Sequence, residues 1–271
     1  MQKKSLHLFL KKVKRSFLIW KTLFLLILFL WLDNIFIKLI SLNINKKEAI
    51  QKSRAKWFTK ELIKLGSAFI KIGQLLSARP DLIPKTWISE LAMLQDEVPQ
   101  FSFIEVEKII KNELKDKYLQ IQYIDPSPIG SASLAQVHKA NLKNGKVVVF
   151  KVQRPNLKNL FIIDLSIMQQ IAFLMQKNKN WSRGRNWVEI AKECRKVLLK
   201  ELDFNSEAQY AARFRQQFLD DENIEIPEVI WDLSTEKVLC LSYLEGTKIS
   251  NIKELKIQNI NLKKIAEVGA I

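Results

Sequence analysis

The sequence predicts an α+β fold in which a helical amino-terminal region precedes an antiparallel sheet that is joined to long helices. Three observations lead to this prediction. Glycine and proline number only seven each in 271 residues, which favours long uninterrupted helices. Stretches on both sides of the chain's centre place apolar residues at helical spacing. Between them, two segments of alternating apolar residues flank an Asn-Gly pair, a pattern that is typical of a β-hairpin.

The composition allows a sizeable core, in one large domain or two modest ones. Lys and Arg total 44 against 28 Asp and Glu, a formal net charge of +16 that is spread along the chain. This charge suits an anionic membrane or nucleic acid, or reflects the base composition of the genome. No helix-turn-helix, zinc or aromatic-ladder pattern accompanies it, so we predict no nucleic-acid partner. Cys194 and Cys240 have neither metal nor disulfide spacing, which fits a reducing compartment.

Residues 1–45 form a basic and apolar segment that we expect to contact a membrane. A cluster of lysines comes first, and the apolar run from Phe17 to Leu32 is interrupted only by Lys21 and Thr22. Its unbroken part is shorter than the roughly 20 apolar residues that a spanning helix needs. We therefore expect a helix lying in the membrane interface first, a true span second, and a cleaved signal peptide last, because no small-residue cleavage site follows.

Residues 46–118 are expected to form a helical extension. Apolar residues at helical spacing predict a helix over 48–78. The turn RPDLIPK follows, and TWISELAMLQ resumes a helix. Ser102 and Glu105 have the spacing of a capping box, which predicts the start of another helix that ends near Leu114.

The sheet is expected within residues 119–244. YLQIQYI alternates as a strand, and the turn at Asn144-Gly145 should pair LAQVHKANL with KVVVFKVQ through two residues with positive backbone torsions. A helix over 155–178 and one long amphipathic helix over 187–218 should follow. EIPEVIWD and EKVLCLSYLEG then read as two strands, and residues 245–271 as a hinge and the start of a further helix.

Lys151 is the candidate site residue of this sheet. It shares a strand face with Val147 and Val149, and a lysine on an apolar face needs an anionic partner or a route to water. An edge-strand lysine that reaches water is the general alternative. Here, however, it follows a loop of small residues at the spacing of a kinase phosphate loop and its strand lysine. The loop residues that can approach a phosphate are Gly130, Ser131, Ala132 and Ser133.

Four long stretches carry a resemblance to a known family: AFIKIGQLLSARPDLIP at 68–84, LQDEVP at 94–99, PIGSASLAQVHKA at 128–140 and KELDFNSEAQYAARF at 200–214. Their order and spacing closely resemble the UbiB, or AarF and ADCK, family of atypical protein-kinase-like proteins. A set of long motifs is far more specific than one short pattern. The resemblance implies a kinase-like smaller lobe, the N-lobe, with a helical extension over the active site. It also implies ATPase rather than protein kinase activity, and a role in isoprenoid-quinone or membrane-lipid metabolism.

For the nucleotide, the resemblance implies ATP and assigns Lys151 as the lysine that contacts its phosphates. The strand that leads to the interlobe hinge ends in Ser242, Tyr243 and Leu244, whose backbone groups would contact adenine. Tyr243 and Leu244 are equally suited to be plain core residues. The loop has one glycine where ordinary kinases have three, so we expect a stiffer loop.

Five further residues match family motifs. Lys71 and Gln74 belong to the KxGQ motif of the extension and, three residues apart, share one helix face. Glu201 and Asp203 match the family's paired carboxylates, and Glu207 matches the helix glutamate that pairs with the strand lysine. If one helix carries all three acids opposite the hairpin, they can serve one site. A solvated helix face is the alternative.

The same resemblance predicts no catalytic residue and no metal ligand among these 271 residues. Phosphoryl transfer in this fold needs a catalytic-loop aspartate, an asparagine and a second metal-binding aspartate. The family's catalytic loop begins with a histidine, and the sequence has only His7 and His138. Asp203-Phe204-Asn205 is similar to the metal-binding DFG triplet, but we reject that match because a long helix is expected there.

We therefore expect a truncated family member that holds the extension and the N-lobe, lacks most of the larger C-lobe, and is not catalytic alone. ATP binding is expected to be weak or absent, and Mg is expected only for a complete member. Its partners would be a membrane surface and a separate polypeptide that supplies the C-lobe. The expected location is a membrane on its cytoplasmic, or stromal or matrix-type, reducing side. The alternative is a membrane-associated, non-catalytic module that binds a nucleotide or a protein.

Overall fold

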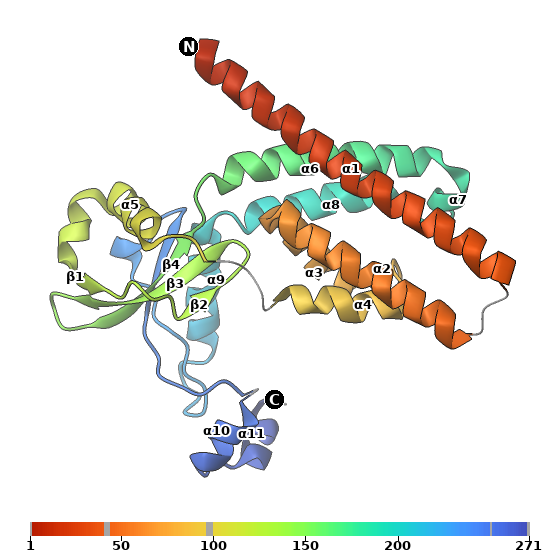
Figure 1. The fold of residues 1–271 in the computed structure, drawn as a ribbon. Helices are drawn as coiled ribbons and strands as arrows, with labels where there is room; N and C mark the ends of the chain where they lie inside the picture. Colours follow the sequence, from red (N-terminus) through yellow and green to blue (C-terminus); the bar gives the residue numbers. More distant parts are fainter. Residues whose placement is uncertain (1, 41–43, 96–99, 250, 270–271) are drawn as a thin grey trace.

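The computed structural model describes residues 2–40, 44–95, 100–249 and 251–269. Figure 1 shows a group of helices beside a smaller part that contains the sheet. The helical part consists of α1 (Gln2–Ile40), α2 (Ile44–Leu65), α3 (Ser67–Ser77), α4 (Lys85–Ala92), α6 (Leu157–Lys177), α7 (Lys179–Ser182) and α8 (Trp187–Lys200). The mixed α+β fold predicted from the sequence is thus confirmed.

The sheet is antiparallel, with β1, β3, β4 and β5 in spatial order and β2 paired to β3. The strands are β1 (Ile121–Ile124), β2 (Gly130–Ser131), β3 (Ala135–Leu142), β4 (Val147–Gln153) and β5 (Val238–Ser242). Alternate residues of β4 point to opposite faces. Phe150 and its even-numbered neighbours are buried against α5 (Phe103–Leu114). The other face, which carries Lys151, lies toward α9 (Phe204–Gln217).

The predicted hairpin forms, with β3 and β4 paired from Ala135 and Gln153 to Asn141 and Val147. The turn differs from the predicted two-residue turn, in which Asn144 and Gly145 would both have positive torsions. Only Gly145 has a positive φ, of 83°, and the turn is longer. The Gly145 N–H donates to the carbonyl of Leu142, which makes a turn with one left-handed residue at its end. The predicted helix start at Ser102 also forms, since its hydroxyl accepts from the Glu105 N–H; the Glu105 carboxylate accepts from that hydroxyl rather than from the Ser102 N–H, so only half of the capping box is present.

Two helices predicted to be continuous are each broken in the structure. The first breaks at Gly66, whose φ of 87° no other residue type adopts easily. The second breaks between α8 and α9, where Asp203 caps α9 by accepting from the Asn205 N–H. Leu202 is buried with the helical part and Phe204 is buried against the sheet. The break therefore allows neighbouring apolar residues to enter two different cores.

The predicted strand EIPEVIWD is also wrong. Its only β-bridge among the described residues joins Val229 to Leu241, and a 3-10 turn, η3 (Trp231–Leu233), follows. Pro227 has no N–H to donate to a ladder, which explains why pairing does not extend. The remaining elements are η1 (Met93–Gln95), η2 (Lys115–Gln120), α10 (Ile252–Ile257) and α11 (Leu262–Gly269).

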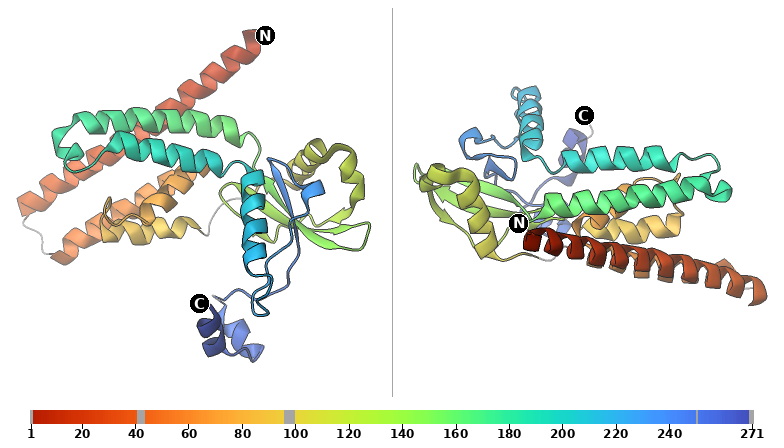
Figure 2. Two further views of the ribbon diagram at one scale, coloured as in Figure 1. Left: turned by 180° about the vertical axis from the view of Figure 1, so that it is seen from behind. Right: turned by 90° about the horizontal axis from the view of Figure 1, so that it is seen from above.

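Two described helices are long and apolar enough to cross a membrane, α1 over Val13–Ile37 and α6 over Leu157–Lys177. They differ in their surroundings. Of the apolar stretch of each helix, 11% is buried inside the protein in α1 and 33% in α6. Figure 2 shows α1 along the outside of the helical part, whereas α6 runs beside α8. The bidentate ion pair of Arg15 with Asp164 joins α1 to α6, with 2.7 Å from Nε and from Nη2 to the two carboxylate oxygens.

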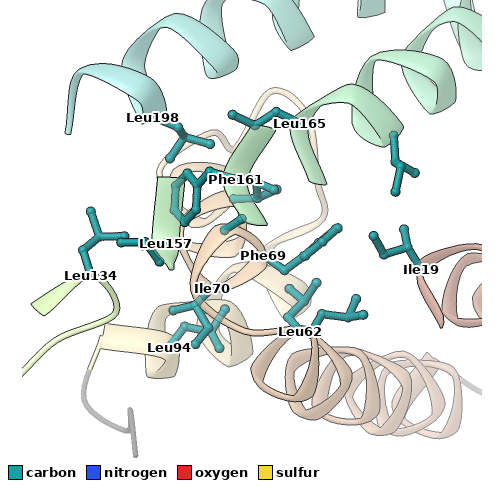
Figure 3. Close-up of a cluster of buried hydrophobic side chains, with 14 of the residues drawn as sticks. Ile19, Leu62, Phe69, Ile70, Leu94, Leu134, Leu157, Phe161, Leu165 and Leu198 are labelled. Carbon is teal, nitrogen blue, oxygen red and sulfur yellow. The ribbon is translucent and has the colours of Figure 1, made fainter. Parts of the chain in front are cut away.

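One apolar core connects the helical part to the loop between β2 and β3. Figure 3 shows Leu134 of that loop beside Leu157 of α6, with Phe161 of α6 and Leu198 of α8 beyond it in the same cluster. The same core contains residues of α2, α3 and α4. Gly73 of α3 permits this close packing, because a Cβ there would lie 2.3 Å from the Leu94 side chain. The loop between β2 and β3 therefore packs against the same apolar core as the helices of the extension.

Candidate functional site

The centre of the candidate site is an ion pair between the sheet and α9. Lys151 Nζ lies 2.5 Å and 2.7 Å from the two carboxylate oxygens of Glu207. The ammonium also lies 5.0 Å from the ring centroid of Phe204, the first residue of α9. The Lys151 side chain is 27% exposed and that of Glu207 is 44% exposed, so the pair is open to solvent on one side. An anionic ligand can reach the ammonium from that side.

The loop after β2 offers donors at different positions from those the sequence suggested. The Ala132 N–H is engaged, since it donates to the Ala135 carbonyl at 2.8 Å. Within the described part of the chain, the N–H groups of Ser133 and Leu134 have no hydrogen-bond acceptor. Leu134 was not predicted as a site residue, because its apolar side chain gave no sign that its backbone is free. The two N–H groups are adjacent in the chain, and no residue of the loop has a positive φ, so the loop does not have the αR-αL backbone of an anion-binding nest.

The KxGQ residues contact two different elements. Lys71 Nζ lies 2.7 Å from a carboxylate oxygen of Glu201, the residue that caps the end of α8. The amide of Gln74 donates to the carbonyl of Leu94 at 3.0 Å, between α3 and the turn that follows α4. The two side chains thus share a helix face but no partner. Most of the LQDEVP stretch, residues 96–99, lies outside the described residues.

The acids of α8 and α9 do not form one cluster. Glu201 pairs with Lys71, Asp203 caps α9, and Glu207 pairs with Lys151. The interruption between the two helices separates these roles. Glu201 and Glu207 are nevertheless six residues apart in one short segment, which connects the ion pair of the extension to that of the sheet. Movement of this segment would change both pairs together.

The hinge residues have fewer free backbone groups than the sequence suggested. The Ser242 N–H donates to the Glu228 carbonyl, and the Tyr243 N–H donates to the Val147 carbonyl at 3.1 Å. The Lys139 ammonium lies over the Tyr243 ring, 4.0 Å from its centroid. Ser242, Tyr243 and Leu244 line a cavity of about 480 Å³ together with the end of α9. The N–H of Leu244 is the hinge donor that the sheet leaves available, among the residues described.

Two charged groups were missed by the sequence interpretation, the buried Asp164 and the half-buried Arg154. Asp164 is 1% exposed and accepts both hydrogen bonds from Arg15; burial raises the pKa of its carboxyl, and Arg15 opposes that rise. The signal was present, because a lone acid in the apolar run LFIIDLSIM needs a partner. Arg154 donates to the loop residues Ser131 and Ala132. Nothing in the local sequence distinguishes it.

Comparison with known proteins identifies a family. A family model described as the ABC1 atypical kinase-like domain matches residues 93–270. The uncharacterized protein sll1770 of Synechocystis is 42% identical over 83% of this chain. Protein ACTIVITY OF BC1 COMPLEX KINASE 7, chloroplastic, of Arabidopsis thaliana is 41% identical over 82% of this chain. A probable protein kinase UbiB of Shewanella denitrificans is 37% identical over 80% of this chain.

These relatives are much longer than this chain, which spans 39%, 32% and 40% of their respective lengths. A solved structure, the Rv3197-erythromycin complex from Mycobacterium tuberculosis, superposes with a TM-score of 0.52 and 26% sequence identity. That match covers 77% of this chain and 52% of the solved chain. The sequence motifs, the sheet with its Lys151–Glu207 pair and the family model agree: the chain belongs to the ABC1 atypical kinase-like family, in which relatives are named UbiB.

Proposed function

We propose that this chain binds the phosphates of ATP at Lys151 and takes part in isoprenoid-quinone or membrane-lipid metabolism on the reducing side of a membrane. The observation that carries the proposal is the solvent-open ion pair of Lys151 with Glu207, in a chain whose adjacent loop has two free N–H groups. In protein kinases the same type of Lys–Glu pair must form before phosphoryl transfer. The family membership supports the choice of ATP.

Each group of the site has a separate task in this proposal. The Lys151 ammonium neutralises phosphate oxygens, and Glu207 holds that ammonium in place. The N–H groups of Ser133 and Leu134 donate to a phosphate oxygen without carrying charge themselves. No three described His, Cys, Asp or Glu side chains lie together as metal ligands. The proposal concerns the contacts of this chain with the nucleotide, and it assigns Mg to complete family members.

Replacing Lys151 by alanine is expected to weaken ATP binding by roughly 10- to 100-fold, because a charge-assisted hydrogen bond contributes about 1.5–3 kcal/mol. Isothermal titration calorimetry of the wild-type chain and the variant measures this. Lys143→Ala, in the exposed hairpin turn, is the matched control and should bind as the wild type does. Equal ATP affinities of the Lys151→Ala variant and the wild type would contradict the assignment of Lys151.

We further propose that residues 1–271 bind ATP without hydrolysing it, because we predict for none of them the role of the catalytic-loop aspartate, the asparagine or the second metal-binding aspartate that phosphoryl transfer in this fold needs. Phosphate release by the wild-type chain is expected to equal that of the Lys151→Ala variant, with and without Mg. The assay is a phosphate-release measurement at saturating ATP. Mg-dependent release that the substitution abolishes would show that this chain hydrolyses ATP itself.

The membrane part of the proposal rests on the outer face of α1. Phe17, Phe24 and Trp31 repeat at seven-residue spacing and are 70%, 64% and 59% exposed. The opposite side of the helix is held by the Arg15–Asp164 pair and by Asp33, which accepts from Arg54 of α2. A spanning helix would have to leave these partners. We therefore propose that α1 lies in the membrane interface with its aromatic face in the lipid.

Changing Phe17, Phe24 and Trp31 to serine together should lower binding to anionic vesicles by on the order of 1,000-fold or more, because each buried aromatic contributes about 1.5–3 kcal/mol and tenfold in affinity is about 1.4 kcal/mol. Vesicle flotation measures the bound fraction. The matched control replaces three apolar residues exposed on the sheet part, Ile104, Leu119 and Tyr123, by serine. If both triple variants float as the wild type does, α1 is not the membrane contact.

A further inference from the structure

Arg154 lies immediately after β4 and reaches back to the loop between β2 and β3. Its Nε and Nη2 atoms both donate to the carbonyl of Ala132, at 3.1 Å and 3.0 Å. Nη2 also donates to the hydroxyl of Ser131 at 3.2 Å. A guanidinium holds its donors in a fixed plane, so these contacts define both the position and the direction of the loop.

The loop is also closed by backbone hydrogen bonds. The Ala132 N–H donates to Ala135, and the Arg154 N–H donates to the Leu134 carbonyl, each at 2.8 Å. Arg154 thus occupies two carbonyls of the loop, that of Ala132 through its guanidinium and that of Leu134 through its backbone N–H. A free carbonyl would repel a phosphate oxygen. The carbonyls of Ala132 and Leu134 are therefore engaged, whereas the N–H groups of Ser133 and Leu134 have no acceptor among the described residues.

Arg154 is itself supported by the segment that leaves the helical part. Its guanidinium carbon lies 5.4 Å from the ring centroid of Phe101. The Phe101 N–H donates to the side-chain oxygen of Gln136 at 2.6 Å, and Gln136 is 1% exposed. Partial burial lowers the pKa of Arg154, although a guanidinium stays charged at neutral pH. Arg154 thus connects the extension, the loop and the end of β4.

We propose that Arg154 is a positioning residue that holds this loop in the conformation that receives a nucleotide phosphate. The inference rests on the proposed function, in which ATP is the ligand. Many enzymes close a mobile loop over a bound substrate. Here the guanidinium fixes the loop before the ligand arrives, so less ordering is required on binding. Lysine cannot replace it, because an ammonium has no planar fork.

The test compares Arg154→Lys with the wild type and with Arg183→Lys, an exposed arginine in the connection between α7 and α8. Calorimetry gives the affinities for ATP and for adenosine, and hydrogen exchange gives the protection of the amides of residues 131–135. Arg154→Lys should lower ATP affinity by about 10-fold, leave adenosine affinity unchanged and speed exchange only in the loop. Arg183→Lys should change none of these.

Unchanged exchange in the loop of Arg154→Lys would overturn the proposal, as would unchanged ATP affinity in a chain that binds ATP. An equal loss for ATP and adenosine would also overturn it, because that result indicates general damage to the site. If the wild-type chain binds no ATP, the proposed function fails. The role of Arg154 in holding the loop is then decided by the exchange result alone.

Discussion

Replacing Arg15 by methionine is expected to lower the free energy of unfolding by about 3–5 kcal/mol, because it leaves a buried carboxylate without its partner. Asp164 is 1% exposed, and both of its oxygens accept from Arg15 at 2.7 Å. Arg15 also donates to the carbonyl of Leu65 at the end of α2. Three helices therefore lose a common connection. In thermal unfolding the loss corresponds to a decrease in Tm of roughly 10 °C.

The pH dependence of this variant gives a second test. Burial raises the pKa of Asp164, and Arg15 is the group that opposes the rise. Without Arg15, the folded-state pKa lies further above the unfolded value. Such a group stabilises the fold below the unfolded pKa, and that contribution is lost as the pH rises through the folded pKa. The deficit of Arg15→Met relative to the wild type should therefore be smaller at pH 5 than at pH 7, in urea denaturation at both values.

Two further variants separate the ion pair from other effects. Lys14→Met makes a similar change at an exposed neighbour and should alter stability by no more than about 0.5 kcal/mol. The double variant Arg15→Met with Asp164→Leu removes both charges and should recover most of the loss. Equal stabilities of Arg15→Met and Lys14→Met would show that α1 is not held by this pair. The pair also means that deletion of residues 1–45 removes more than a membrane contact.

The sheet and the Lys151–Glu207 pair were accessible from sequence because their signals are local or carried by long motifs. The alternation of apolar residues defined the faces of β4, and the Asn-Gly turn located the hairpin. The break between α8 and α9 was missed, although a signal existed. Leu198 and Leu202 continue one apolar row, whereas Phe204 and Ala208 begin another, shifted by two residues. This change of phase marks the point at which the chain enters a second core.

The partners of the site residues could not be predicted in the same way, because they come from distant parts of the chain. Spacing correctly placed Lys71 and Gln74 on one face of α3. It could not show that one contacts Glu201 and the other the carbonyl of Leu94. Likewise, the free N–H of Leu134 depends on how the loop rests on the helical core. Such features follow from tertiary packing rather than from local pattern.

Replacing Phe161 by alanine is expected to lower the free energy of unfolding by about 3–5 kcal/mol, because its ring is 1% exposed in the core that joins α6 to the loop. Phe161→Leu keeps most of the volume and should lose less than about 1.5 kcal/mol. Phe173, on the same helix, is 52% exposed, so Phe173→Ala is the matched control with a change of about 0.5 kcal/mol or less. Urea denaturation of the three variants measures these differences.

The same variant tests whether the extension supports the loop between β2 and β3, for which we propose phosphate binding. Phe161 and Leu134 belong to one buried cluster, with Leu157 between them in Figure 3, so the cavity left by alanine opens in the core on which the loop packs. A cavity removes packing contacts from the residues that line it. Hydrogen exchange at residues 131–135 should then be faster in Phe161→Ala than in Phe173→Ala, measured where both variants are folded. Equal exchange would mean that Arg154 and the backbone hydrogen bonds hold the loop without help from the core. The helical part would then contribute stability but not the geometry of the proposed nucleotide site.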